Sequence, residues 1–191
     1  MVKKIKLYNN FKISKSHQKS ILLIGNFDGL HLGHQKLFKL SKQYKKKNKM
    51  KLGVVTFDPI PKMFFNKNLK NYRISNLNQK IRYFKSYDVD FIIVKKFDKQ
   101  FSKIKCFNFI EQILYKKLNA KYIFVSNNFR FGNKREGNVK LLKKYEQLFN
   151  YKVVKPEPFI KGKKIVSSSL IRNLLEKGLL HKANNLLKRN W

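Results

Sequence analysis

The 191-residue sequence carries a formal net charge of +35, and 42% of its residues are hydrophobic, among them 17 Phe and 9 Tyr. This length is sufficient to bury a core in one domain, and a disordered chain would hold fewer aromatic residues. No apolar run approaches the roughly 18 to 20 residues of a membrane span, and the N-terminus contains no apolar secretory signal. Because Cys106 is the one cysteine, the chain forms no internal disulfide, and we expect a cytoplasmic, reducing location.

The positive charge does not by itself predict binding to nucleic acid. Only six of the 45 basic residues are Arg, the lysines are spread along the whole chain, and Ala occurs only twice. Lys, Asn, Ile, Phe and Tyr are abundant, and their codons are AT-rich. We therefore interpret the charge as drift in an AT-rich genome rather than as a selected phosphate-binding face, and dedicated nucleic-acid binding is not expected.

Short apolar runs alternate with amphipathic segments along the chain. In chain order the pattern predicts strand 21–24, helix 33–44, strand 52–57, helix 78–87, strand 91–94, helix 107–118, strand 122–125, helix 136–149, strand 152–154 and two closing helices, 169–177 and 180–188, separated by Gly178. Strands that alternate with helices predict a parallel sheet, and fully apolar strands predict helices on both faces. We expect one α/β domain over 1–191, a doubly wound parallel sheet with the closing helices, 169–188, packed on it. Ligands of such sheets bind at the carboxyl ends of the strands.

The segment 25–34, GNFDGLHLGH, lies between the first predicted strand and the first predicted helix. Gly25 and Gly29 allow the backbone to approach a ligand closely, and the helix start offers unpaired N–H groups and a positive dipole end to a phosphate. His31 and His34 flank this start, where imidazoles can donate hydrogen bonds as charge develops on a phosphoryl group. A glycine-rich loop with two surface histidines is the plain alternative, but H-x-G-H in a strand–loop–helix context favours a nucleotide site.

The segment 166–172, VSSSLIR, opens a predicted helix. A serine is a good N-cap, so a simple cap is the alternative to a functional role. The helix dipole disfavours Arg172 near a helix N-terminus, and a bound anion would relieve that conflict. Hydroxyls, N–H groups and a guanidinium at one place therefore predict a site for triphosphate or pyrophosphate.

Two further polar segments follow predicted strands, 56–61 (TFDPIP) and 126–137 (SNNFRFGNKREG). Their aromatic rings, amides and arginine are suited to frame a flat ring and its phosphate. Either segment alone is also typical of an ordinary polar loop, so each is weak evidence on its own.

Together, these four segments closely resemble the adenylyltransferase module of prokaryotic FAD synthetases, the bifunctional riboflavin kinase/FMN adenylyltransferases. Residues 25–34 match the family pattern G-x-F-D-G-x-H-x-G-H, residues 128–132 match N-F-x-F-G, and residues 135–137 match R-x-G. Residues 167–172 resemble S-S-T-x-I-R, and residues 56–61 resemble T-F-D-P-H-P. The similarity covers nearly the whole chain, in order and at the family's spacing.

The resemblance implies a Rossmann-like nucleotidyltransferase of the H-x-G-H superfamily. Such an enzyme would transfer AMP from ATP to FMN, giving FAD and pyrophosphate with assistance from Mg²⁺, whose ligands the sequence does not identify. The catalytic residues that it implies are His31, His34 and Arg172. The residues that it implies for ATP binding are Gly25, Asn26, Phe27, Asp28, Gly29, Ser167, Ser168 and Ser169. Those that it implies for flavin binding are Phe57, Asp58, Pro59, Asn128, Phe129 and Arg130.

Three departures from the family pattern bear on activity. Ile60 stands where the family has a histidine between two prolines, and Ser126 stands where it has a glycine. We expect Ile60 to weaken the enzyme rather than abolish its activity, and Ser126 to bear on substrate affinity or rate. The riboflavin kinase module that normally follows is not in the sequence, so we expect FAD from FMN but no FMN from riboflavin. Whether the chain is a complete protein or a fragment of a bifunctional enzyme stays open.

Other functions also stay open at this point. The first segment alone fits an H-x-G-H nucleotidyltransferase that acts on pantetheine phosphate, nicotinate mononucleotide or an alcohol phosphate. A basic RNA-binding protein without catalysis would instead bind RNA tightly, with a steep salt dependence, and would not bind flavin. A third alternative is a remnant that keeps the fold but has little turnover. The sequence gives no indication of an oligomeric state.

Overall fold

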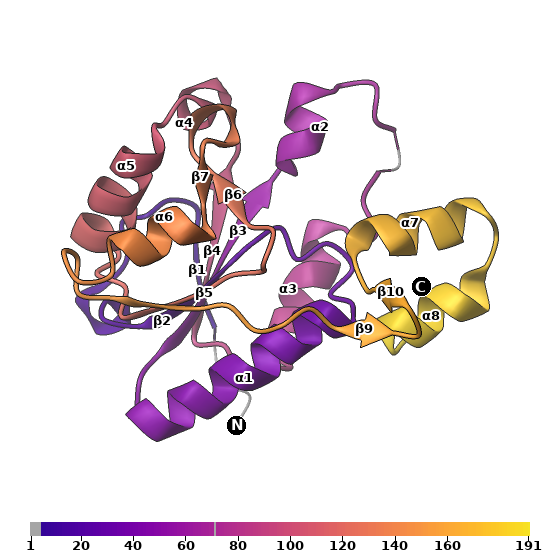
Figure 1. Ribbon diagram of the computed structural model, residues 1–191, viewed down its shortest axis with the longest axis horizontal. Helices are drawn as coiled ribbons and strands as arrows, with labels where there is room; N and C mark the ends of the chain where they lie inside the picture. Colours follow the sequence, from indigo (N-terminus) through magenta and orange to yellow (C-terminus); the bar gives the residue numbers. More distant parts are fainter. Residues whose placement is uncertain (1–4, 71) are drawn as a thin grey trace.

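A six-stranded parallel sheet forms the centre of the molecule (Figure 1) in the computed structural model, which describes residues 5–70 and 72–191. The strands lie in the order β1-β4-β3-β2-β5-β8. Their bounds are β1 Lys6–Tyr8, β2 Ile21–Ile24, β3 Leu52–Asp58, β4 Phe91–Lys96, β5 Tyr122–Phe124 and β8 Lys152–Val154. The apolar side chains of β2 and β3 are buried throughout these central strands, as expected for a sheet covered on both faces.

The order of the strands reverses at β2. From β2 the chain adds β3 and then β4 on one side of the sheet, whereas β5 and then β8 lie on the other side. Leu23 of β2 is paired with Val54 of β3 and with Phe124 of β5, so the carboxyl ends of these three strands meet at one edge. A ligand crevice is expected at such a switch point, outside the carboxyl ends of the strands.

Helices cover both faces of the sheet (Figure 1). On one face, α1 (Leu32–Asn48) and α3 (Leu77–Lys85) share a buried apolar cluster with β2, in which Phe38 and Phe84 lie near Leu23. The π-helix η2 (Phe109–Lys117) and α6 (Val139–Lys144) share the second cluster with Leu22 and Ile24. The shorter helical segments are η1 Lys15–His17, α2 Pro61–Phe65, α4 Lys99–Ser102, α5 Cys106–Asn108 and η3 Asn133–Arg135. Successive side chains of β2 therefore pack into the two apolar clusters in turn, Leu22 and Ile24 into one and Ile21 and Leu23 into the other.

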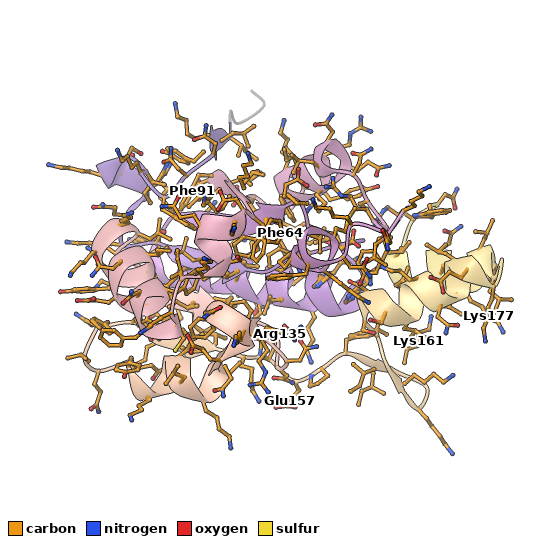
Figure 2. The ribbon with its side chains drawn as sticks, turned by 90° about the horizontal axis from the view of Figure 1, so that it is seen from above. Phe64, Phe91, Arg135, Glu157, Lys161 and Lys177 are labelled. Carbon is orange, nitrogen blue, oxygen red and sulfur yellow. The ribbon has the colours of Figure 1, made fainter. Side chains whose placement is uncertain are left out.

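The C-terminal helices α7 (Ser168–Glu176) and α8 (Leu180–Leu187) lie at one end of the molecule with the hairpin β9 (Ile160–Lys161) and β10 (Lys164–Ile165) (Figure 1). Lys161 and Lys177 mark this end in Figure 2, where amine nitrogens project from all sides of the outline. Ile171, Ala183 and Leu187 build a third apolar cluster there with Ile74, which precedes α3. This packing places the start of α7 against the loops at the carboxyl edge of the sheet.

The structure confirms the doubly wound α/β prediction, the five predicted strands and the break at Gly178, whose φ is +68°. The predicted helix 136–149 is wrong at both ends. The chain first forms the short strand β7 (Gly137–Asn138), paired with β6 (Arg130–Phe131), and Asn138 then caps α6 by accepting a hydrogen bond from the N–H of Leu141. Strand β1, helix α2 and the hairpins were not predicted, because segments of two to five residues carry no readable period.

Candidate active site

The loop between β2 and α1 has a strained backbone. Phe27 and Leu30 have φ values of 47° and 40°, in the left-handed region that favours glycine, and Gly29 has a φ of 79°. A side chain at Gly29 would also meet the Cγ2 of Ile74 at 2.8 Å. Backbone strain of this kind costs about 1–3 kcal/mol per residue and gathers at functional sites, where the surrounding structure holds it in place.

His31 and His34 are brought together at the end of this loop. Their rings stack with centroids 3.8 Å apart, and His31 is the N-cap residue of α1. Burial, together with the charges of Arg172 and Arg189, lowers the pKa of His31 from 6.5 to about 4. Burial, then the charges of His31 and Lys80, lowers the pKa of His34 well below its ordinary value. Both imidazoles are therefore neutral at neutral pH, and each carries one N–H donor.

The buried Nδ1 atoms of this histidine pair have no hydrogen-bond partner. Buried polar atoms usually have one, so each exception needs an explanation. His34 as a whole is only half-buried, although its Nδ1 is closed off from solvent. A pair of rings packed in this way at a helix start is placed to meet a ligand that approaches the loop.

The start of α7 lies directly against the same loop. Ser167 is the N-cap residue, and its Oγ accepts the N–H of Leu170 at 3.2 Å. Ser168 donates its hydroxyl proton to the carbonyl of Asp28 at 2.9 Å, whereas Ser169 is exposed. Ser167 is therefore a helix cap, and Ser168 connects two of the predicted segments, whereas the binding of phosphate by these serines stays a prediction.

Asp28 is a buried anchor rather than a surface residue of the loop, with 2% of its surface exposed. Its carboxylate accepts the backbone N–H groups of Ile74 and Ser75 at 3.1 Å and the Nη2 of Arg172 at 2.7 Å. Arg172 also donates its Nε to the carbonyl of Tyr72 and lies 3.8 Å above the ring of Tyr72. The charge conflict at this helix start is thus relieved by Asp28, a partner that the sequence pattern did not indicate.

Strand β3 ends with Phe57 and Asp58, and Pro59 follows it; the resemblance to the family implied that all three contact flavin. Asp58 forms an ion pair of 2.8 Å with Arg73, and the Asp58–Pro59 peptide bond is cis. Ile60, which replaces the family histidine, is buried with 3% of its surface exposed. An isoleucine suits this buried position, and a histidine here would have to be desolvated.

The loop after β5 also begins at the carboxyl edge of the sheet, and two of its polar side chains bond to each other. Ser126, which replaces the family glycine, donates its hydroxyl proton to the Oδ1 of Asn128 at 2.9 Å. Asn128 is a predicted flavin contact, and this hydrogen bond engages its amide oxygen. Asn128 and Arg130 are exposed, and the ring of Phe129 stacks on that of Phe131 at 5.6 Å.

A row of buried and partly buried aromatic rings runs from the end of β3 to β6. Phe57 lies 5.7 Å from Phe101, Phe101 lies 6.4 Å from Phe109, and Phe109 lies 5.3 Å from Phe131, measured between ring centroids. Phe64, on α2 and labelled near the middle of Figure 2, lies 5.3 Å from Phe97 in the same region. The sequence singled out Phe57 but not Phe101 or Phe109, since Phe is so common in the chain that few of them stand out.

Three arginines and a lysine gather at this edge around two carboxylates. Arg172 is paired with Asp28, and Arg73 is paired with Asp58. Lys80 is buried near both carboxylates, and Arg189 donates to the carbonyl of Gly29 at 2.6 Å. Sequence analysis identified Arg172 alone among these four cations, although the scarcity of Arg in the chain was a signal for Arg73 and Arg189. The surplus of positive charge suits an anionic ligand.

The same residues do not form a metal cage. Within residues 5–70 and 72–191, no group of three or more His, Cys, Asp or Glu side chains is placed to hold a metal ion. Asp28 and Asp58 are each paired with an arginine. These residues do not fit a Mg²⁺ ion held by protein ligands alone.

A hollow of about 410 Å³ opens at the opposite, amino edge of the sheet, next to Met50, Tyr122 and Lys152. None of the residues that the sequence predicted for the site lines this hollow.

In the part of the chain that the structure describes, no helix has the length and apolar character needed to cross a membrane.

Known proteins match this chain in sequence and in fold. The family model described as FAD synthetase matches residues 13–170. A bifunctional riboflavin kinase/FMN adenylyltransferase of Buchnera aphidicola (subsp. Acyrthosiphon pisum) is 41% identical over 93% of this chain and 56% of its own length. The protein of that name in Escherichia coli K12 is 33% identical, over 87% of this chain and 53% of its own length. A crystal structure named as a macrolide-efflux protein from Streptococcus pneumoniae superposes with a TM-score of 0.83 at 26% identity and covers 97% of this chain and 62% of that one.

A parallel sheet that reverses at β2, with the H-x-G-H loop at its carboxyl edge, places the molecule among the Rossmann-like nucleotidyltransferases. Within this class the chain belongs to the FAD synthetase family, whose model matches it over most of its length. The chain spans a little over half the length of the curated relatives that it matches.

Proposed function

We propose that this chain is an FMN adenylyltransferase, which transfers AMP from ATP to FMN and releases pyrophosphate. The observation that carries the proposal is the meeting of the stacked pair His31 and His34 with the start of α7 at the switch point of the sheet. A helix N-terminus and an excess of buried cations both favour a bound polyphosphate. Adenylyl transfer needs little else, because positioning and charge stabilisation account for most catalysis of phosphoryl transfer.

In the proposed reaction, a phosphate oxygen of FMN attacks the α-phosphorus of ATP in line. The new P–O bond forms as the bond between the α-phosphorus and the bridging oxygen to the β-phosphate breaks, and pyrophosphate leaves. His31 and His34, held neutral, donate N–H groups to the phosphoryl oxygens on which charge develops. No covalent enzyme intermediate is required.

ATP would lie along the strained loop after β2, with its β- and γ-phosphates at the start of α7. Ser169 is exposed there and free of the bonds that Ser167 and Ser168 make. Arg172 is a cation beside this position, held by Asp28 so that its guanidinium keeps one orientation. We propose that ATP enters as its Mg²⁺ complex, since Mg²⁺ in such sites is held largely by substrate phosphates.

FMN would lie between the loops after β3 and β5. The partly exposed ring of Phe129 and the exposed side chains of Asn128 and Arg130 suit a flat ring and a phosphate. Phe129 stacks on Phe131. The proposed flavin contacts Asn128 and Arg130 are thus exposed, whereas Asp28 and His31 near the proposed ATP site are buried.

The choice of acceptor distinguishes this function from its rivals. Purified protein is incubated with ATP, Mg²⁺ and one phosphate acceptor at a time: FMN, pantetheine phosphate, nicotinate mononucleotide or glycerol phosphate. We expect pyrophosphate release with FMN alone. Release with another acceptor would assign a different nucleotidyltransferase, and tight, salt-steep RNA binding without any pyrophosphate would favour the noncatalytic alternative.

A further inference from the structure

Lys80, in the first part of α3, is a buried cation to which the proposed reaction gives no role. Only 1% of its surface is exposed, an unusual state for a lysine outside an ion pair. Its Nζ donates to the carbonyl of Asn26 at 3.3 Å and to the Oγ1 of Thr56 at 3.5 Å, while Thr56 donates to the same carbonyl at 3.2 Å. Its few acceptors lie at the ends of β2 and β3, where the two proposed substrate loops begin.

Lys80 is not needed to neutralise the carboxylates near it. Asp28 already pairs with Arg172 at 2.7 Å, and Asp58 already pairs with Arg73 at 2.8 Å. An unpaired charge is costly to bury, and an apolar residue of similar size would avoid that cost. Because the fold has no evident need of this charge, the lysine calls for another explanation.

Near the loop after β2, some buried polar atoms also lack hydrogen-bond partners. The Oδ1 of Asn26 and the Nδ1 of His34 are buried without a hydrogen-bond partner. Asn26 belongs to the loop that leads to the histidine pair, and Thr56, the other acceptor of Lys80, lies near the end of β3, which leads to the proposed flavin site. The ammonium thus lies beneath the junction of the two loops on which the reacting phosphates must be aligned.

We propose that Lys80 is a positioning residue for adenylyl transfer, one that fixes the loop after β2 against the end of β3. Its hydrogen bonds to Asn26 and Thr56 set the relative position of the two loops, so that the FMN phosphate faces the α-phosphorus in line. A small misplacement of reacting groups lowers the rate far more than it weakens binding. The role rests on the proposed function and acts through the loops, because the buried ammonium is not open to substrate.

The test compares Lys80→Met with the wild-type protein and with Lys85→Met, which removes an exposed charge from the same helix. Steady-state FAD formation and melting temperature are measured for each protein. We expect Lys80→Met to lower kcat about tenfold, with KM for ATP and for FMN and the melting temperature nearly unchanged. Lys80→Arg should restore part of kcat, and Lys85→Met should match the wild type.

An unchanged kcat in Lys80→Met would overturn the proposal, as would a lowered melting temperature with a normal kcat for the folded fraction. If Lys80→Met does not fold, Lys80→Gln is measured by the same criteria, and failure of both to fold would make Lys80 a residue of the fold alone. A wild-type protein that makes no FAD would instead remove the proposed function, so the two failures are distinguishable.

Discussion

The buried pair of Asp28 and Arg172 gives a prediction whose size follows from the contacts. Asp28→Asn keeps the shape of the side chain but leaves the guanidinium of Arg172, with 13% of its side chain exposed, without its carboxylate at 2.7 Å. Removing one partner of a buried ion pair costs about 3–5 kcal/mol. We expect about 3 kcal/mol here, because the ring of Tyr72 and its carbonyl still stabilise the cation.

For a chain of this length, about 3 kcal/mol corresponds to a melting temperature lower by roughly 6–12 °C. Arg172→Met should cost less than Asp28→Asn, because the Asp28 carboxylate retains the N–H groups of Ile74 and Ser75. The double variant should lose less unfolding free energy than the two single variants lose together, and the difference, the coupling energy, should be about 2 kcal/mol. Denaturant unfolding of the four proteins measures this cycle.

The matched control is a cycle on the exposed pair of Glu111 and Lys116, which lie 2.9 Å apart. Exposed pairs contribute little, so the coupling there should not be distinguishable from zero. Equal coupling in the two cycles, or additive losses for Asp28 and Arg172, would refute the assignment of Asp28 as a buried anchor. Arg172 would then be free to serve ATP alone.

His31→Ala and His34→Ala should each lower kcat by ~10²–10³ while KM for ATP changes little, and unchanged turnover in both would remove them from the mechanism. Because the pKa of His31 is lowered to about 4, the unfolded chain takes up a proton first as the pH falls. The stability contributed by neutral His31 is therefore complete above pH 6.5 and is lost towards pH 4, by at most about 3 kcal/mol; unfolding at several pH values should show a shallower slope for His31→Gln. Ile60→His should lower the melting temperature, because it buries an imidazole at a position where 3% of the residue surface is exposed. It should also raise turnover, and a fall in turnover as well as in melting temperature would mean that the loop is fitted to isoleucine. Ser126→Gly frees the Oδ1 of Asn128 and should lower KM for FMN, and an unchanged KM would separate this hydrogen bond from flavin binding.

The sequence predicted those parts of the molecule that depend on local patterns. The apolar runs at Ile21–Ile24 and Lys152–Val154 became strands at the predicted residues, and the H-x-G-H segment lies at the carboxyl edge as expected. A period of two or 3.6 residues and a glycine-rich turn are properties of neighbours in the chain. Local patterns of this kind therefore identify elements and loops, but not the contacts between them.

The parts that the sequence did not predict depend on residues far apart in the chain. Asp28 was expected to line the ATP site, but its partners are Ile74, 46 positions away, and Arg172, 144 positions away. The predicted helix 136–149 failed because pairing of β7 with β6 and the cap at Asn138 override a helical pattern. Burial of Lys80 is equally a consequence of packing, and an isolated Lys in a Lys-rich chain gives no signal.

The most direct test of the central claim is the identity of the product. Purified protein is incubated with FMN, Mg²⁺ and ATP labelled at the α-phosphate, and the mixture is separated by chromatography. We predict one labelled flavin product that coelutes with FAD, formed in equal amount with pyrophosphate, and none when riboflavin replaces FMN. Label that stays in ATP or appears only as free AMP would contradict the assignment of this chain as an FMN adenylyltransferase.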